Sequence, residues 1–585
     1  MTIPILQSSR CRHGYSILVV IVFAAISFMA LGAALDWCLT NGRLTDRNNQ
    51  YYTTAAAAEA ATEKVLSVLT RDYASQGEAL VYHNLRVYRD LVPRNTEDRT
   101  WANYEFMDSA GNLNQTTVER LSAASSYLPL NSKFTGMYGA ASTYRIEAVA
   151  RMPDAVNDIG VGVQQIIQLA TIPVFQFAIF YSMDMEVNPG PDMRVTGRVH
   201  GNANINLHPG NTLTFASDVT AAGKIIHTKH TNDPSSRPVT PGRIVYEDKH
   251  SSGANSLTLP IGTNNTPAAV HAIIEAPPSG EAPTSAIGRQ RYYNKSDIVV
   301  VLSNSTINVS SGLANNFSTP IPYDDWNVFL RTNVSFYNKR EGKTVNAVQL
   351  SVANLKAWSA TNSVIRSVLG SRDVRSIYIA DMRSQLASTQ SGVKVVDGSE
   401  LPSLGLTVAT PNPLYVQGHF NATGSDVGRN ETALAKPASL VGDAITILST
   451  AWSDANSALA VSSRTAANTT VNAAIIAGNV ASGGGYYSGG VENFPRFLEN
   501  WSGRTLHYNG SMVALYQSAI ARAPWGGSDV YSPPARNWAF DRNYTDALKL
   551  PPGTPEVRAV IKSSWSTVAA PKIDRELTTV TVSTP

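Results

Sequence analysis

At 585 residues the chain is long enough for several domains or for one long repetitive domain. Charged residues make up only 16% of it, against about 25% in an ordinary soluble domain, and Asn, Ser, Thr and Gly replace them. The formal net charge of +3 is close to neutral for this length. Because nucleic-acid binding requires a strong positive field, DNA and RNA are excluded as expected partners. The two cysteines cannot form a disulfide framework or a cysteine-rich metal site.

An uncharged apolar segment runs from Tyr15 to Leu35. As a helix of 21 residues it would be about 31 Å long, which matches the hydrocarbon core of a bilayer at about 30 Å. Basic residues and no acidic ones precede the segment, and Asp36 follows it. The positive-inside bias therefore places the N-terminus in the cytoplasm. We expect a basic leader at 1–14, a transmembrane helix at 15–36 and a lipid bilayer as partner.

The junction between leader and apolar segment reads Arg12-His13-Gly14-Tyr15-Ser16: basic residues, a glycine, an aromatic residue and then the helix. It resembles the class III signal of type IV pilins and pseudopilins. The resemblance implies that a prepilin peptidase cuts after the glycine, so Gly14 and Tyr15 are the candidate processing site. That family usually has a glutamate at the fifth mature position, where this chain has Val19. A start without this glutamate most resembles the PilX-type accessory pilins.

Three other kinds of N-terminal segment could account for the apolar run. A cleaved signal peptide would find a small-x-small site at Ala30-Leu31-Gly32, although its apolar stretch is usually about 7–15 residues long. An uncut signal anchor would keep Met1. A lipoprotein signal is excluded, because the residue before Cys38 is a tryptophan rather than a small residue.

Residues 37–93 predict an extended helix that is rich in alanine from Tyr51 to Leu66. Asn41-Gly42 is the expected break between membrane and exported helix, and Pro93 is the expected end. The small residues permit close helix packing. Packing against other helices or a sheet and a solvated stalk remain alternative interpretations.

A pilin-like α+β domain is predicted at 94–187, because alternating apolar residues indicate half-buried strands at Tyr144–Arg151 and Val161–Ala170. A helix is expected around Thr117–Ser125. The almost wholly apolar run Ile172–Tyr181 is too short to span a bilayer, so a buried strand or packed helix is expected.

Residues 188–480 predict a β-rich, β-helix-like body with insertions. Short runs such as Val195–Leu207 and Asp218–Ile226 alternate apolar with small polar residues between turn residues, as stacked β-solenoid turns require. This texture resembles bactofilin-like right-handed parallel β-helices. An irregular β-sandwich is the competing prediction, since no strict period is visible. Ala347–Leu369 reads as helical.

Residues 481–585 predict an aromatic-rich C-terminal cap region and tail. They resemble the C-terminal region of large bacterial envelope proteins that carry PilX-like starts. The predicted fold class is thus mainly β with a long N-terminal α-helix: a transmembrane helix, a pilin-like α+β domain, and a β-helix (solenoid) or β-sandwich body.

No catalytic, cofactor-binding or metal-binding residues are predicted. His227, His230 and Asp233 come nearest to a metal motif, but they run from a strand into a loop without a second ligand pair. Asp324 and Asp325 would suit a carbohydrate-cleaving cleft, but no second acid with its own context can be named. A lone aspartate at 443 is expected to have a turn or capping role.

The sequence therefore predicts a non-catalytic, single-pass protein of the bacterial inner membrane, with its body in the periplasm or on the cell surface. It would be a pseudopilin-like component of a type IV pilus or type II secretion system, in assembly or adhesion, with pilin or pseudopilin subunits as partners. The alternative is a surface β-helix protein that binds or degrades polysaccharide. A third hypothesis is a scaffold that polymerises by end-to-end stacking of its solenoid.

Overall fold

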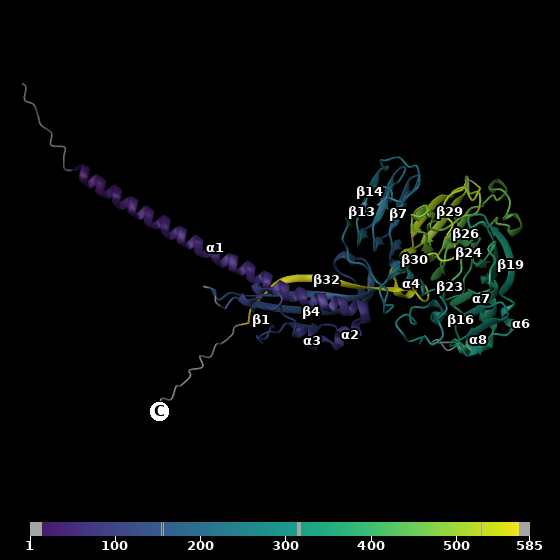
Figure 1. The fold of residues 1–585 in the computed structure, drawn as a ribbon, viewed down its shortest axis with the longest axis horizontal. Helices are drawn as coiled ribbons and strands as arrows, with labels where there is room; N and C mark the ends of the chain where they lie inside the picture. Colours follow the sequence, from purple (N-terminus) through teal and green to yellow (C-terminus); the bar gives the residue numbers. More distant parts are fainter. Residues whose placement is uncertain (1–14, 154, 156, 313–316, 528, 572–585) are drawn as a thin grey trace, which may run out of the picture.

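The structure is a computed structural model that describes residues 15–153, 155, 157–312, 317–527 and 529–571. Its first element, α1 (Tyr15–Gln76), is a single helix of 62 residues that projects away from the rest of the molecule (Figure 1). The part of the chain beyond it is mostly β. This arrangement confirms the predicted fold class of a long N-terminal helix followed by a mainly β body.

The expected helix break at Asn41-Gly42 is wrong, because α1 runs through both residues. An interior glycine costs a helix only about 1 kcal/mol, which a helix of this length tolerates. The expected end at Pro93 is also wrong, because α1 ends at Gln76. The next residue, Gly77, has a φ of +80°, which suits a residue without a Cβ atom. Two short helices follow, α2 (Glu78–His83) and α3 (Leu85–Arg89).

The second half of α1 packs on an antiparallel sheet, and we call the two together the helix–sheet body. The sheet order is β1-β4-β5-β32, with β2 and β3 also paired to β4. The small buried residues Ala57, Ala58 and Ala61 let the helix approach this sheet closely. Of the two interpretations of this stretch of helix, packing against a sheet is therefore correct and a solvated stalk is not. The strand bounds are β1 Glu105–Met107, β2 Thr117–Arg120, β3 Ser126–Pro129, β4 Tyr138–Arg151, β5 Gly160–Pro173 and β32 Glu556–Ala569.

The helix expected around Thr117–Ser125 is wrong. Residues 117–120 form β2, which pairs with β4 through Val118↔Ile146 and its neighbours. Val118 and Ile146 are both buried there, so sheet pairing overrides a weak local preference. Strand β32 is paired along β5 from Glu556↔Pro173 to Ala569↔Val161. Part of the predicted C-terminal cap region and tail therefore belongs to the first sheet.

The chain between β5 and β32, residues 174–555, forms a second unit that we call the stacked body. Its first arm winds through three strands per turn, and each strand pairs in parallel with the strand one turn later, as in Ile179↔Val199 and Met185↔Ile205. Successive turns of this arm are thus stacked in parallel. The strands are β6 Ile179–Tyr181, β7 Met185–Val187, β8 Met193–Val195, β9 Val199–Gly201, β10 Ile205–Leu207, β11 Leu213–Phe215, β12 Val219–Ala221, β13 Ile225–Ile226, β14 Ile244–Tyr246 and β15 His250–Ser251.

The second arm starts at the far end of the stack and winds back toward the first. Antiparallel strands β17–β19 pair with the strands at that far end. The antiparallel strands are β17 Ile307–Ser311, β18 Thr319–Pro320 and β19 Leu330–Asn338. The parallel strands are β16 Ile298–Leu302, β20 Lys343–Ser351, β21 Ser376–Asp381, β22 Thr389–Val396, β23 Leu406–Ala409, β24 Leu414–Gln417, β25 Ala438–Gly442, β26 Ile445–Leu448, β27 Thr469–Asn472, β28 Ala474–Asn479, β29 Thr505–Gly510, β30 Met512–Gln517 and β31 Ala535–Phe540.

The helix expected at Ala347–Leu369 begins later than predicted, because residues 347–351 complete β20. Its remainder is divided between α7 and α8, and Asn362 caps the second helix by accepting from the Ile365 N–H at 3.0 Å. The helices of the stacked body are α4 Pro267–His271, α5 Tyr292–Lys295, α6 Tyr323–Trp326, α7 Val352–Thr361 and α8 Ser363–Val368.

The two arms meet in the middle of the stacked body, at a junction that we call the seam. There β6 of the first arm pairs in parallel with β30 of the second, through Ile179↔Met512. This pairing makes one continuous sheet of twelve strands from β15 to β18. The run Ile172–Tyr181, expected as one buried strand or helix, is divided: it ends β5, makes a short 3-10 turn at Val174–Gln176 and then forms β6.

Candidate functional site: the exposed helix and the seam

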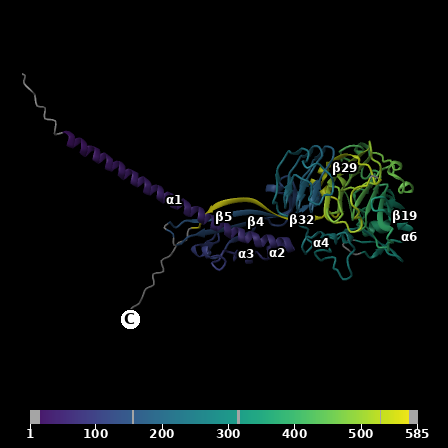
Figure 2. The ribbon, with the colours of Figure 1, turned by 45° about the horizontal axis from the view of Figure 1, so that its top comes forward.

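The first part of α1 is apolar and touches nothing else in the described chain. Ile17, Phe23 and Phe28 are 67%, 66% and 74% exposed, and the helix becomes buried only from Thr54 onward. Figure 2 shows the same rod from a second angle, standing clear of both bodies. By length and composition this helix is able to cross a membrane, and it lies near the N-terminus. Exposed apolar surface of this extent marks a membrane or interaction surface.

The predicted processing site lies at the start of this helix. Gly14 is outside the described residues, and Tyr15 is the first residue of α1, with 85% of its surface exposed. Val19, which stands where pilins usually carry a glutamate, is also exposed.

The three residues of the weak metal motif do not converge on one point. The Nε2 atom of His227 lies 2.9 Å from the Tyr246 hydroxyl, whereas His230 lies 3.6 Å from the Asp184 carboxylate. Within the described ranges, no group of three His, Cys, Asp or Glu side chains is placed to hold a metal ion.

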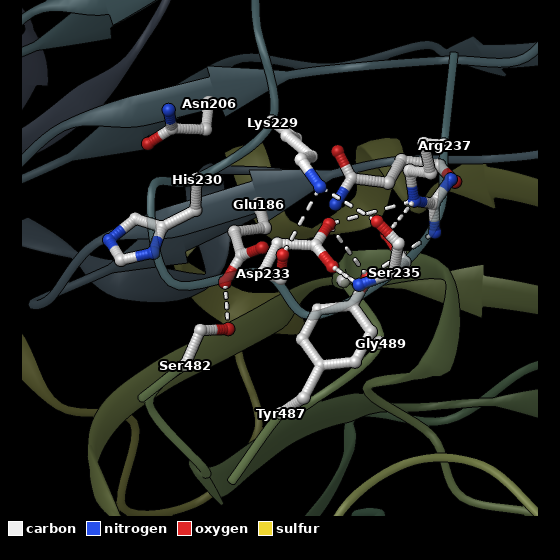
Figure 3. A network of polar contacts seen from close by, with 12 residues as sticks. Glu186, Asn206, Lys229, His230, Asp233, Ser235, Arg237, Ser482, Tyr487 and Gly489 are labelled. Atoms are coloured by element: carbon white, nitrogen blue, oxygen red, sulfur yellow. Dashed lines mark hydrogen bonds and ion pairs between the residues drawn. The ribbon is translucent and has the colours of Figure 1, made fainter. Parts of the chain in front are cut away.

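Asp233 instead organises a polar network across the seam (Figure 3). Its buried carboxylate accepts from the Ser235 N–H at 2.8 Å and the Tyr487 hydroxyl at 3.3 Å, and it pairs with the Arg237 guanidinium at 3.6 Å. The Lys229 ammonium donates to two carbonyls of the same loop, those of Asp233 at 3.3 Å and Ser235 at 2.7 Å. The network thus fastens a loop of the first arm to the segment between β28 and β29 of the second.

Glu186, on β7, extends this network. The Ser482 hydroxyl donates to one of its carboxylate oxygens, and the other oxygen is buried without a partner among the described residues. Burial raises the pKa of Glu186, which the Ser482 hydrogen bond and nearby His230 partly oppose. Buried charges need partners inside a protein. We therefore interpret the network around Asp233 and Glu186 as a structural contact that stabilises the junction between the two arms.

We expect Asp233→Asn to lower the free energy of unfolding by roughly 2–4 kcal/mol, because it leaves the Arg237 guanidinium without a compensating charge. Urea unfolding of the full chain in detergent measures this change. Asp248→Asn, at an exposed loop position, is the control and should change stability by less than about 0.5 kcal/mol. Equal stability of the two variants would contradict the role given to Asp233.

The remaining acids that the sequence singles out also have structural partners. Asp443 accepts from the N–H groups of Ala519, Ile520 and Ala521, the last at 2.7 Å, which agrees with the predicted capping role. His271 lies 3.9 Å from this carboxylate. Burial alone would lower the pKa of His271, but the nearby Asp443 carboxylate and the hydrogen bond to Glu275 raise it to about 9.

Asp325 is occupied by two hydrogen bonds, from the Trp358 indole N–H at 3.1 Å and the Asn362 amide at 3.2 Å. It ties α6 to α7 and α8. Asp324 beside it is exposed. The two carboxyls therefore do not face each other across a cleft, as a glycosidase pair would.

A groove on the seam was not predicted. It has a volume of about 500 Å³ and lies where β8 and β31 face each other. Its side chains come from segments far apart in the chain, with Thr212 and Thr214 on one side and Asn537 and Trp538 on the other. The only sequence signal was the cluster Arg536-Asn537-Trp538 in an aromatic-rich region.

No protein-family model matches the chain, and no curated protein matches it. Among solved structures, the chain is similar to the competence-associated pilin ComZ from Thermus thermophilus. The two share 9% identity over 89% of this chain and 97% of that chain, with a TM-score of 0.29. A similarity of this size assigns no function, so the class of the protein is argued from its own residues.

Proposed function

We propose that this chain is a non-catalytic, membrane-anchored subunit, a pilin-like or pseudopilin-like component of a type IV pilus or type II secretion system. One observation carries the proposal: a single unbroken helix is apolar and exposed from Tyr15 onward, then packs on an antiparallel sheet from Thr54 onward. The first half suits a bilayer and the second half holds a folded head.

The orientation follows from the charges that flank the helix. The basic leader at 1–14 stays in the cytoplasm, and the body is exported to the periplasm or the cell surface. The bilayer is the first partner, and other pilin or pseudopilin subunits are the second. An apolar residue at Val19 makes the anchor easier to keep in lipid than a buried carboxylate would, in keeping with an accessory, PilX-type subunit in assembly or adhesion.

N-terminal sequencing of the mature protein tests the proposal. We expect the mature chain to begin at Tyr15, and Gly14→Val to leave the leader attached. Gly32→Val is the matched control, since a Cβ atom at Gly32 would meet nothing within 4 Å. A start near Ala33, abolished by the control substitution, would instead identify a secreted protein, and a start at Met1 would identify a plain signal anchor.

A second candidate function, binding of surface polysaccharide, is favoured by the polar groove on the seam. Cleavage of polysaccharide is not proposed, because Asp325 is already engaged in hydrogen bonds to Trp358 and Asn362.

A further inference from the structure

The two arms of the stacked body are hydrogen-bonded to each other as sheets on one face only. On that face β6 and β30 form a regular parallel ladder. On the next face, among the strands that the structure describes, β8 is paired only with β11 and β31 only with β29, although Cα atoms of β8 and β31 approach within 8 Å. The neighbouring strands β8 and β31 therefore form no backbone ladder with each other across the seam.

The free edge of β8 can be assigned from its hydrogen bonds. The Met193 N–H donates to the Thr212 carbonyl, and the Val195 carbonyl accepts from the Ala216 N–H, both at 2.9 Å. These two residues of β8 are turned toward β11. Because successive residues of a parallel strand bond to opposite sides, the backbone of Arg194 faces the seam.

The same alternation holds for β31. The Ala535 N–H donates to the Arg504 carbonyl of the neighbouring turn at 2.9 Å, so the backbone of Arg536 and Trp538 faces the seam. At the end of the strand, the Phe540 N–H crosses the seam and donates to the Thr196 hydroxyl at 2.9 Å. A side chain replaces a backbone partner there, which closes one end of the groove.

The side chains that line the groove are mostly neutral and polar. Thr212 and Thr214 point outward, because Leu213 and Phe215 between and beside them are buried in the core. On the opposite wall, Asn537 receives a hydrogen bond from Asn430 and lies 3.0 Å from a His507 ring nitrogen. The indole N–H of Trp538 is buried and has no partner among the described residues.

Three charged side chains line the groove, and each already has a polar partner: the Asp192 carboxylate accepts from the Thr212 N–H at 2.8 Å. Arg194 forms a two-point ion pair with Glu247, with both distances at 2.6 Å. Arg536 donates to the Glu492 carbonyl at 2.8 Å, and its guanidinium lies 5.6 Å from the centre of the Trp538 ring. What remains for a ligand is a set of hydroxyl, amide and backbone groups. The opposite charges of Asp192 and Arg536 leave no strong net field, which suits a neutral ligand rather than an ion.

The width of the groove decides between two kinds of extended neutral ligand. Inserting a peptide strand between β8 and β31 would require a separation of about 9.6 Å, twice the spacing of paired strands. The Cα atoms of the two strands are already within 8 Å. Peptide recognition at a sheet edge also needs apolar pockets for alternate side chains, and the walls of this groove are mainly polar. A chain of sugar rings lying over the edges needs no insertion, and its hydroxyls both donate and accept.

We propose that the groove between β8 and β31 binds a neutral oligosaccharide. The hydroxyls of Thr212 and Thr214 and the amide of Asn537 contact sugar hydroxyls, and the free backbone edges supply further donors and acceptors. A volume of about 500 Å³ is within the usual range for small-ligand sites, about 300–1,000 Å³. This site does not depend on membrane anchoring; it rests on the second candidate function, polysaccharide binding, and specifies its ligand class and its residues.

The test is calorimetric titration of the full chain in detergent with maltohexaose, cellohexaose and chitohexaose. We expect saturable binding of at least one of them with a Kd below about 1 mM, and Thr214→Tyr should weaken it by about tenfold or more. Val245→Tyr is the matched control. Val245 is the register partner of Thr214 one turn further from the seam, is also half-buried and does not line the groove. It should change the Kd by less than about twofold.

Asn537→Ala provides a second variant from the opposite wall, in case Thr214→Tyr unfolds the chain. Loss of binding in this variant, with thermal unfolding unchanged, supports the site. Absence of saturable binding to all three sugars, binding that neither variant weakens, or binding of an extended Thr-Val decapeptide in their place would overturn the proposal. Since none of these outcomes depends on where the mature chain starts, failure here is distinguishable from failure of the anchoring proposal.

Discussion

Truncation of the chain after Pro555 is expected to unfold the helix–sheet body while the stacked body stays folded. The truncation removes β32, whose Val557, Ala559 and Ile561 are 0%, 6% and 3% exposed. Burial of such side chains stabilises by about 1.5–3 kcal/mol for each large one, and the pairing with β5 runs the length of the strand. A loss of this size is comparable with the whole stability of an ordinary domain, about 5–15 kcal/mol.

Limited proteolysis of the full chain in detergent checks this expectation. The truncated protein should be cut within β4 and β5 (138–173), which lose their neighbour, while residues 178–540 stay protected. Truncation after Pro571 is the matched control, because it keeps every described residue of β32. The expectation is contradicted if both truncated forms resist protease to the same extent.

Strand β32 brings the end of the described chain back to the first sheet, next to β5. This pairing shows which parts of the fold can be predicted from the sequence. The anchor is readable because its signal is local: an uncharged run from Tyr15 to Leu35 depends on no distant partner. The partner of β5 cannot be predicted from the sequence. Ile172 and Val557 are paired in the sheet, but the whole stacked body lies between them in the chain. The residues of β32 alternate in the manner of any half-buried strand and do not specify a partner.

The stacked turns are an intermediate case. Turns in the first arm have a constant length, so Ile179, Val199 and Val219 fall in register. The period is lost at the loop between Ile226 and Ile244, and in the second arm the turns vary in length. When the loops of a repeat change in length, its strands can stay in register in the structure. The sequence then shows the alternation of apolar and polar residues but no constant repeat length.

The polar sites at the seam are the least predictable feature. In the sequence, Asp233 and His230 are neighbours in a weak metal motif, but the partners that decide the role of Asp233 include Tyr487, from the other arm. The groove likewise needs Thr214 and Trp538 to meet. Nothing in either segment alone indicates that the two lie on opposite walls, because the meeting of the arms is a property of the whole stack.

Two buried carboxyls in the last turns of the stack predict a fall in stability between about pH 4.5 and pH 7. Burial raises the pKa of Glu492 and that of Glu499 to about 7, from 4.5. Hydrogen bonds to their carboxylates oppose this rise. The Asn188 N–H donates to Glu492 at 3.1 Å, and the Ser449 N–H and hydroxyl donate to Glu499 at 2.6 and 2.7 Å.

The sign follows from proton binding in the two states. Between pH 4.5 and 7 the folded chain holds protons on Glu492 and Glu499 that the unfolded chain has already released. The folded state thus binds more protons, so the free energy of unfolding falls as the pH rises through this window. Each carboxyl contributes at most about 3 kcal/mol to the fall. Glu492→Gln and Glu499→Gln remove the two largest of these contributions, so the double variant should lose stability with pH much less steeply than the unmodified chain. Glu186, whose pKa burial also raises, retains part of the fall.

Urea unfolding of the full chain at pH 4.5, 6 and 7.5 measures the effect, with Glu247→Gln as the control. The Glu247 carboxyl is on the surface, and its hydrogen bond to Arg194 lowers its pKa. A lowered pKa acts in the opposite direction, so the control should retain the fall in stability. A double variant that loses stability with pH as steeply as the unmodified chain would show that other groups titrate. If Glu492 and Glu499 are responsible, the seam and the neighbouring turns are most stable in mildly acidic solution, because burial favours the protonated carboxyls there.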